Sequence, residues 1–382
     1  MNFARSFISD LRLSCAPAIG FLLVGLCWGS FAGSVPDIKA AIGAGDGVFG
    51  GAMFLSALGA LAAMWLAPRI EAGLGPRAMQ GAALVMAVSF LLPGFATNVA
   101  FFTVAMLFAS AGSGSLDVIM NTRLSGIEAD SKRSLMNLNH ALFSFAYAGA
   151  AINAGVLREM GFGPATVFGI VLVITLLLLP VMFHRPAPIE QDGDAKSIKL
   201  PSKLILFGGL IIMFAFLAEQ ATEAWSALHL ERSLGGSAAQ GALGPAILGL
   251  TMGVGRLSGQ FVTTYVRETR ALQIAGLIAA LGAIIAASAS DLLTAYIGFG
   301  ILGLGVSVMA PMAYSAVGKR VSNQQRALVI TRISVIGYMG FFVGPPLMGG
   351  LSEAFSLYVS FYAVAALLLC ITIILAPMLR KQ

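Results

Sequence analysis

The chain has 382 residues, of which 58% are hydrophobic and only 10% are charged, and its mean hydropathy is +0.89. Soluble globular proteins carry about 25% charged residues, so this composition excludes a soluble enzyme, a disordered chain and a nucleic-acid-binding module. The net charge of +6 fits the basic cytoplasmic loops of membrane proteins. The three cysteines lie in apolar runs without paired or metal-ligand spacing, so we expect neither a disulfide framework nor a metal site.

Twelve apolar segments follow one another along the chain. Each is close to the roughly 20 residues that a transmembrane helix needs. The expected spans are 14–36, 47–67, 78–96, 99–122, 134–157, 163–183, 203–226, 241–264, 271–289, 292–316, 328–351 and 356–378.

One long polar interval, with three prolines, separates the first six spans from the last six. The sequence therefore predicts an all-α membrane protein whose twelve transmembrane helices form two pseudo-symmetric six-helix bundles. We expect the N-terminal bundle at residues 1–183, a cytoplasmic central loop at 184–203 and the C-terminal bundle at 204–382.

The two halves resemble each other in sequence. Residues 133–135 (Arg-Ser-Leu) open the fifth span, and residues 326–328 (Arg-Ala-Leu) open the eleventh. Residues 112–114 (Gly-Ser-Gly) in the fourth span match residues 303–305 (Gly-Leu-Gly) in the tenth. The common order of these matches indicates a parallel repeat, which is typical of secondary transporters.

The distribution of basic residues predicts the orientation. With a cytoplasmic N-terminus, the outer loops hold only Lys39, Arg158 and Arg232 of the 23 Lys and Arg residues, and Arg256 and Arg332 lie within spans. Because basic residues resist translocation, we expect an integral protein of the bacterial inner membrane with both termini in the cytoplasm. Three acidic residues fall at outer span ends, where we expect them only to face water: Asp37, Asp291 and Glu353.

Motifs of soluble enzymes are absent from the sequence. It contains no GxSxG, HExxH or Walker motif, and His140, His184 and His229 lie on different segments. Residues 45–50 (GDGVFG) match a dinucleotide-binding pattern, but a span follows at once and no strand precedes it, so we interpret Asp46 as a helix N-cap. We expect no enzyme, no ATP-driven pump, no cofactor and no metal.

Glycines recur every four residues in the first span, at Gly25, Gly29 and Gly33. Residues without side chains let a neighbouring helix come close. The spacing therefore predicts tight helix packing on this face.

A Gly-Pro-Pro sequence interrupts the eleventh span at Gly344, Pro345 and Pro346. Proline removes a backbone donor and bends helices. We interpret this span as a bent gating helix; the alternative is that the helix ends here.

Ionisable residues inside spans are the main functional candidates, because a charge in hydrocarbon normally faces a cavity or a partner. By depth, Asp117, His140, Arg256 and Arg332 form one layer on four helices, and Asn121 lies one turn from Asp117. Two hypotheses stay open. Either these residues form a charge lock between the halves at the inner end, with the two arginines as gating residues, or Asp117 carries a coupling proton tuned by His140.

The seventh span carries a second group of polar residues. Glu219 and Glu223 share one helix face with Gln220 beside them. We expect Glu219 to be a second proton-coupling acid, closer to the outside than the inner layer. Glu223, Gln220 and Asn121 are expected to bind substrate, together with Trp28 and Trp225, which are suited to stack on a ring or a cation. The alternatives are a solvated helix end for Glu223 and an interfacial aromatic belt for the tryptophans.

Over its whole length the chain resembles the major facilitator superfamily. The loop at residues 68–77 is similar to the signature of that family: Gly75 and Arg77 fit, whereas the usual aspartate is absent and Glu71 stands one position away.

Three stretches look like the MosC-like inner-membrane proteins, named for a rhizopine locus: residues 28–30 with 35–38, residues 114–118 with 120–121, and Glu219 with 225–226. The acid-then-Asn pair in the fourth span is also similar to fucose-permease-like symporters. That resemblance implies a role for Asp117 in proton coupling.

These observations favour a secondary active transporter that moves a small polar solute, such as a sugar, polyol or amino-polyol, with protons by alternating access. One alternative is proton-driven efflux of hydrophobic or cationic compounds. A second is a membrane sensor or assembly partner that transports nothing. We expect a monomer whose partners are its substrate, protons and the lipid bilayer, without nucleic acid.

The topology can be tested with reporter fusions. A reporter at Lys196 should report a cytoplasmic location and one at Gly236 an external location, because of the basic-residue asymmetry. Cytoplasmic labelling at Gly236 would overturn the span assignment.

Overall fold

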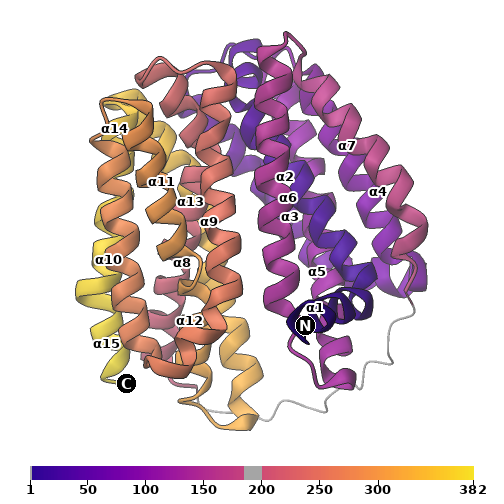
Figure 1. The fold of residues 1–382 in the computed structure, drawn as a ribbon, viewed down its shortest axis with the longest axis vertical. Helices are drawn as coiled ribbons and strands as arrows, with labels where there is room; N and C mark the ends of the chain where they lie inside the picture. The colour runs from indigo at the N-terminus through magenta and orange to yellow at the C-terminus, as the bar shows by residue number, and fades with distance from the viewer. Residues whose placement is uncertain (1, 185–199) are drawn as a thin grey trace.

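The computed structural model describes residues 2–184 and 200–382, so most of the predicted central loop lies outside the described residues. All regular structure in the described part is helical, which confirms the predicted fold class. Figure 1 shows two groups of long helices side by side, with both chain termini at the same end. We call this the terminal end and the opposite one the far end.

The N-terminal half comprises α1 (Asn2–Leu13), α2 (Cys15–Ala41), α3 (Asp46–Leu74), η1 (Gly75–Arg77), α4 (Ala78–Leu91), η2 (Leu92–Phe95), α5 (Val99–Ser131), α6 (Met136–Glu159), α7 (Pro164–Leu178) and η3 (Leu179–Met182). The C-terminal half comprises α8 (Ser202–Leu228), η4 (His229–Ser233), α9 (Ala238–Tyr265), α10 (Glu268–Ala287), α11 (Leu292–Val306), α12 (Met309–Gly318), α13 (Asn323–Ala354), α14 (Leu357–Cys370), η5 (Ile371–Leu375) and α15 (Ala376–Arg380).

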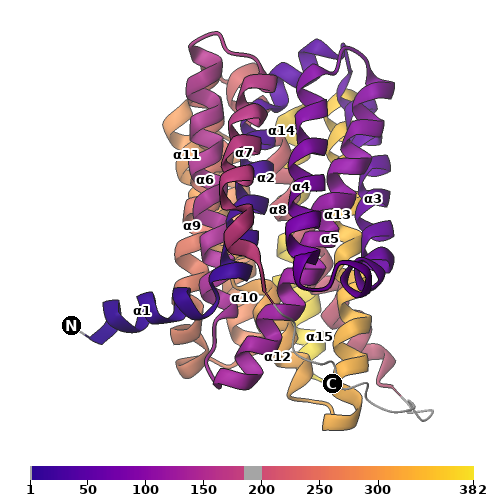
Figure 2. The ribbon, with the colours of Figure 1, turned by 90° about the vertical axis from the view of Figure 1, so that its right-hand side faces the viewer.

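The helices match the twelve predicted spans in order. Eleven helical segments of the described chain are long and apolar enough to cross a membrane, and α9 occupies the place of the eighth predicted span. One helix was not predicted: α1 precedes the first span and runs out sideways from the bundle (Figure 2).

One local prediction needs correction, and one alternative is excluded. Gly45, not Asp46, is the N-cap of α3, and Asp46 is the first helical residue. The helix does not end at Pro345, because α13 continues to Ala354. Packing on α3 supports that continuation: a Cβ atom at Gly50 would lie 2.4 Å from the Pro345 carbonyl oxygen, so the two backbones touch.

Glycines let α2 pack directly on the backbone of α6, as the four-residue spacing predicts. A Cβ atom at Gly29 would lie 2.1 Å from the carbonyl oxygen of Tyr147, and one at Gly33 would lie 2.7 Å from that of Ala151. No real Cβ atom approaches a backbone oxygen so closely. The position of α6, which carries several of the site residues below, therefore depends on these glycines.

We expect Gly29→Ala to destabilise the protein by about 1–3 kcal/mol, the usual cost of an overpacked core. The reason is that the methyl group forces α2 away from α6. The melting temperature of the purified protein in detergent measures this. Gly149→Ala in α6 is the control, because nothing lies within 4 Å of a Cβ atom there. Equal melting temperatures for the two variants would contradict the close-packing interpretation.

Candidate functional site

Arg256 connects the two halves between the ends of the bundle. From α9, its guanidinium donates to the carboxylate of Glu219 on α8 at 3.0 Å. It also donates to the hydroxyl of Ser144 and, at 3.4 Å, to the carbonyl oxygen of His140, both on α6 of the N-terminal half. Glu219 lies 17 residues after Ser202, the first residue of α8, which is roughly 26 Å along the helix axis.

This arrangement corrects the expected depth of Glu219. Glu219 was expected closer to the outside than the inner layer of Arg256 and His140, whereas it pairs with Arg256 directly. The length of the arginine side chain bridges the offset between the two helix positions. Arg256 bonds the His140 carbonyl oxygen, and the His140 ring interacts with Arg256 electrostatically and packs edge-on against Phe21, with 4.7 Å between ring centroids.

Buried polar atoms without partners lie on α6 and α8, the helices that Arg256 bonds. The hydroxyl of Tyr147, from α6, is fully enclosed and has no hydrogen-bond partner among the described residues. It interacts electrostatically with both Glu219 and Glu223. On α8, the amide oxygen of Gln220 and the indole nitrogen of Trp225 also lack partners in the described part of the chain. A buried polar group without a partner costs stability.

Trp225 faces the other half of the molecule. Its ring is completely buried and stands edge-on to Phe49 of α3, with 5.8 Å between ring centroids. The alternative interpretation, that Trp225 belongs to an interfacial aromatic belt, is therefore wrong. Gln220 lies against Gly344, where a Cβ atom would be 2.9 Å from its amide oxygen.

Trp28 has a different environment. Its indole N–H donates to the hydroxyl of Ser113 at 2.9 Å, and its ring stands edge-on to Phe90 at 5.1 Å. All three residues belong to the N-terminal half, so Trp28 joins α2 to α4 and α5.

Asp117 forms a second polar group, on α5. The side-chain amide of Asn121 donates to the Asp117 carboxylate at 3.0 Å and to its carbonyl oxygen at 2.9 Å, so the expected one-turn pairing is present. Asp117 interacts electrostatically with Tyr338 of α13, in the other half. The Arg332 side chain is exposed in this conformation, and its pairing with the N-terminal half when the terminal end closes stays a prediction.

A charge cluster that was not predicted from the sequence lies at the far end. The guanidinium of Arg158 on α6 donates to Glu231 of η4, in the other half, at 2.8 Å. It also donates to Asp37 at 2.6 Å and to the carbonyl oxygen of Gly33 at 2.8 Å. Asp37, expected only to face water, is thus an ion-pair partner of a buried arginine.

Asp46 is the second centre of this cluster. It accepts from Arg232 of η4 at 2.6 Å and from Lys39 at 2.8 Å, and the hydroxyl of Ser352 donates to it. Glu353 was also expected only to face water, but its carboxylate accepts the backbone N–H of Gly47. Exposed Asp291 does lie at the surface, where it caps α11 by accepting from the Thr294 N–H at 3.0 Å.

We call these contacts the far-end lock: Arg158 with Asp37 and Glu231, and Asp46 with Lys39, Arg232 and Ser352. Among the described residues, Arg158–Glu231 and Arg232–Asp46 are the two ion pairs that join the halves. The π-helical turn η4 supplies one partner to each. Because both pairs lie at the far end, the halves are closed there.

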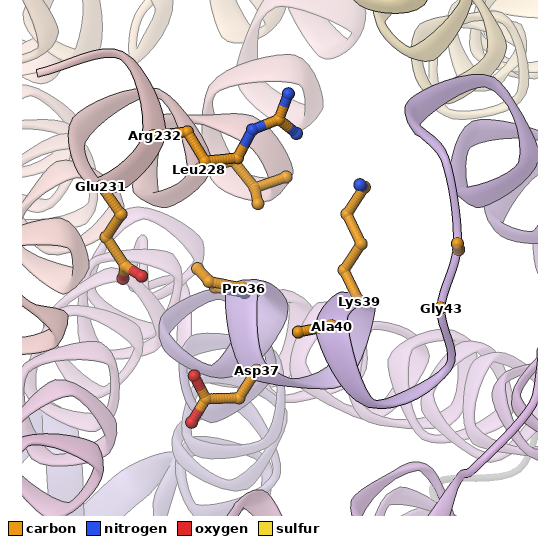
Figure 3. A pocket seen from close by; sticks show the side chains of 9 residues that line it. Pro36, Asp37, Lys39, Ala40, Gly43, Leu228, Glu231 and Arg232 are labelled. Carbon is orange, nitrogen blue, oxygen red and sulfur yellow. The ribbon is translucent and has the colours of Figure 1, made fainter. Parts of the chain in front are cut away.

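Figure 3 shows the pocket beside the lock, which has a volume of about 400 Å³. The side chains of Glu231 and Arg232 project to different sides of η4, and those of Asp37 and Lys39 to different sides of α2. The sequence did contain a signal for the far-end lock. Lys39, Arg158 and Arg232 are the three basic residues of the predicted outer loops, and all three belong to the lock.

The family-like segment 68–77, which forms the end of α3 and η1, keeps a charge contact despite its altered sequence. Glu71 accepts from the buried guanidinium of Arg123 on α5 at 2.9 Å. Arg123 also donates to the carbonyl oxygens of Gly75 at 2.7 Å and His184 at 2.8 Å. Burial and the adjacent Arg123 charge lower the pKa of the His184 imidazole. The displaced Glu71 therefore still fixes the loop to a transmembrane helix.

Comparison with known proteins identifies the relatives of the chain. The family model described as Major Facilitator Superfamily matches residues 18–300 and 210–382. An uncharacterized MFS-type transporter of Yersinia pestis is 30% identical, with 92% of both chains covered. The membrane protein MosC of Rhizobium meliloti is 27% identical, over 90% of this chain and 84% of that protein.

Solved structures share the fold. A bacterial homolog of the human lysosomal transporter Spinster, in an inward-facing and occupied conformation, has a TM-score of 0.74 at 15% identity and covers 97% of this chain and 96% of its own. A D-xylose–proton symporter has a TM-score of 0.73 at 12% identity, with 97% of both chains covered.

We expect Glu231→Gln to weaken the far-end lock, because Arg158 then loses its charged partner in the other half. A hydrogen bond to a charged group contributes about 1.5–3 kcal/mol, so the population open at the far end should rise about tenfold or more. The readout is labelling of Leu228→Cys, a buried position that lines the pocket with Pro36 and Asp37 of the other half, by an impermeant maleimide added outside cells, in a variant without the native cysteines.

Glu268→Gln is the matched control, because Glu268 pairs with Lys319 inside the C-terminal half. Equal labelling rates in the Glu231 and Glu268 variants would exclude a locking role.

Proposed function

Since the chain belongs to the major facilitator superfamily of membrane transporters, we propose that it moves a small polar solute together with protons by alternating access. The observation that carries this proposal is the polar group between the halves: Arg256, Glu219 and Ser144 bonded across the interface, with Tyr147 and Gln220 unpartnered beside them. Transporters of this architecture hold their substrate near the membrane midplane between the two repeats.

The chemistry of this group supports a hydroxyl- or amine-bearing solute. Carboxylates, an amide oxygen and a tyrosine hydroxyl accept or donate hydrogen bonds, and the Trp225 indole offers both an N–H and an aromatic face. Sugars, polyols and amino-polyols present complementary groups. The xylose–proton symporter shares only the fold with this chain, so this substrate class rests on the site itself.

Asp117 is the first candidate for the proton carrier. Its carboxylate has the Asn121 amide as partner and, among the described residues, forms no ion pair. It can therefore take up a proton without releasing a buried cation. Protonation of Glu219, by contrast, weakens the pair with Arg256 and leaves that guanidinium with its neutral partners on α6. Glu219 is thus suited to link protonation to movement between the halves, as the second acid.

Flux measurements in proteoliposomes test the transport proposal. With an imposed proton gradient, labelled sugars, polyols and amino-polyols should accumulate inside vesicles and dissipate the gradient. Accumulation of a lipophilic cation such as tetraphenylphosphonium, but of no polyol, would favour efflux of hydrophobic cations. A thermal shift with a polyol, but no flux of any solute, would favour a sensor.

We expect Asp117→Asn to abolish accumulation of solute against its gradient while solute exchange across the membrane continues. The substitution keeps the shape of the side chain and removes its titration. Asp130→Asn, an exposed position on the same helix, is the control and should accumulate solute normally. Accumulation that persists in Asp117→Asn would move the proton-carrying role to Glu219.

A further inference from the structure

Helix α1 leaves the bundle at a fixed corner. The hydroxyl of Ser14 is buried between α1 and α2, where it donates to the carbonyl oxygen of Asp10 at 3.0 Å and accepts from the side-chain amide of Asn139 at 3.1 Å. Because α2 begins at Cys15 and crosses the membrane, α1 extends sideways at the depth where α2 enters the bilayer (Figure 2).

The two sides of α1 differ in polarity. Asp10 forms an ion pair with Arg133 at 2.7 Å, and Arg133 donates to the hydroxyl of Ser9 at 2.9 Å. Arg133 belongs to the turn between α5 and α6, so this contact fixes the rotation of α1 about its axis. Phe7 and Ile8 lie on a different side of the helix and are 38% and 51% exposed.

A bilayer surface fits this side of α1 better than water does. Amphipathic helices that lie in the membrane interface bury their apolar face at the boundary of headgroups and acyl chains. Two basic side chains at this corner are exposed: Arg12 on α1, and Lys132, which precedes Arg133 in the turn. Cations at this depth attract anionic lipid headgroups.

We propose that α1 is an in-plane membrane anchor of the N-terminal half, which inserts Phe7 and Ile8 between lipids and binds anionic phospholipid headgroups through Arg12 and Lys132. The bonds of Ser14 and Arg133 connect α1 to α2, α5 and α6, so the anchor holds this half at a fixed depth and tilt. The C-terminal half has no such connection to α1 among the described contacts.

Spin labels on the full chain test the anchor. Phe7→Cys and Arg12→Cys, each in a variant without the native cysteines, carry a nitroxide in reconstituted vesicles of phosphatidylcholine alone or mixed with phosphatidylglycerol. The ratio of accessibility to oxygen over accessibility to a water-soluble nickel chelate reports depth. We expect this ratio to be several-fold higher at Phe7 than at Arg12, and the Phe7 label to lie deeper in the mixed vesicles.

Three results would overturn the proposal. Equal ratios at the two positions would place α1 in water. Equal depth in both lipid mixtures would remove the headgroup contact. Spin–spin coupling between Phe7 labels, lost when labelled protein is diluted with unlabelled protein, would assign the apolar side of α1 to a second copy of the chain.

Discussion

The guanidinium group of Arg158 fixes the conformation described here. It is almost fully enclosed, and a charge in such a place is stable only with partners that neutralise it. Its partners are the Gly33 carbonyl oxygen and the Asp37 carboxylate in its own half, and the Glu231 carboxylate in the other. Separation of the halves at the far end removes one carboxylate from this cation.

The interior contacts of Arg256 accompany that closure. With the far end closed, α6 and α9 lie close enough for Arg256 to reach Ser144 as well as Glu219. Small residues allow the approach: a Cβ atom at Gly155 would lie 2.4 Å from the Cβ atom of Ala242. The polar group in the middle and the charge cluster at the far end are thus connected through one tightly packed helix pair.

Much of the fold is readable from the sequence because hydrocarbon imposes a strong pattern on a spanning helix. The order of the twelve spans and the α2 glycine face were therefore predictable, as was the one-turn pair of Asp117 and Asn121. Partners across helices were not, since they depend on side-chain reach and on which end of the molecule is closed. Asp37 and Glu353 illustrate this: each ends a span near water, yet each bonds a group on a distant segment.

The unbroken course of α13 has a mechanical consequence. Its contact with Gly50 at Pro345 lies seven residues from Ser352 and thirteen from Arg332, about 10 Å and 20 Å along the axis at 1.5 Å per residue. A rigid helix that tilts about this contact acts as a lever with arms of unequal length. If α13 tilts about this contact without bending at its two prolines, a separation of Ser352 from Asp46 moves Arg332 about twice as far in the opposite direction.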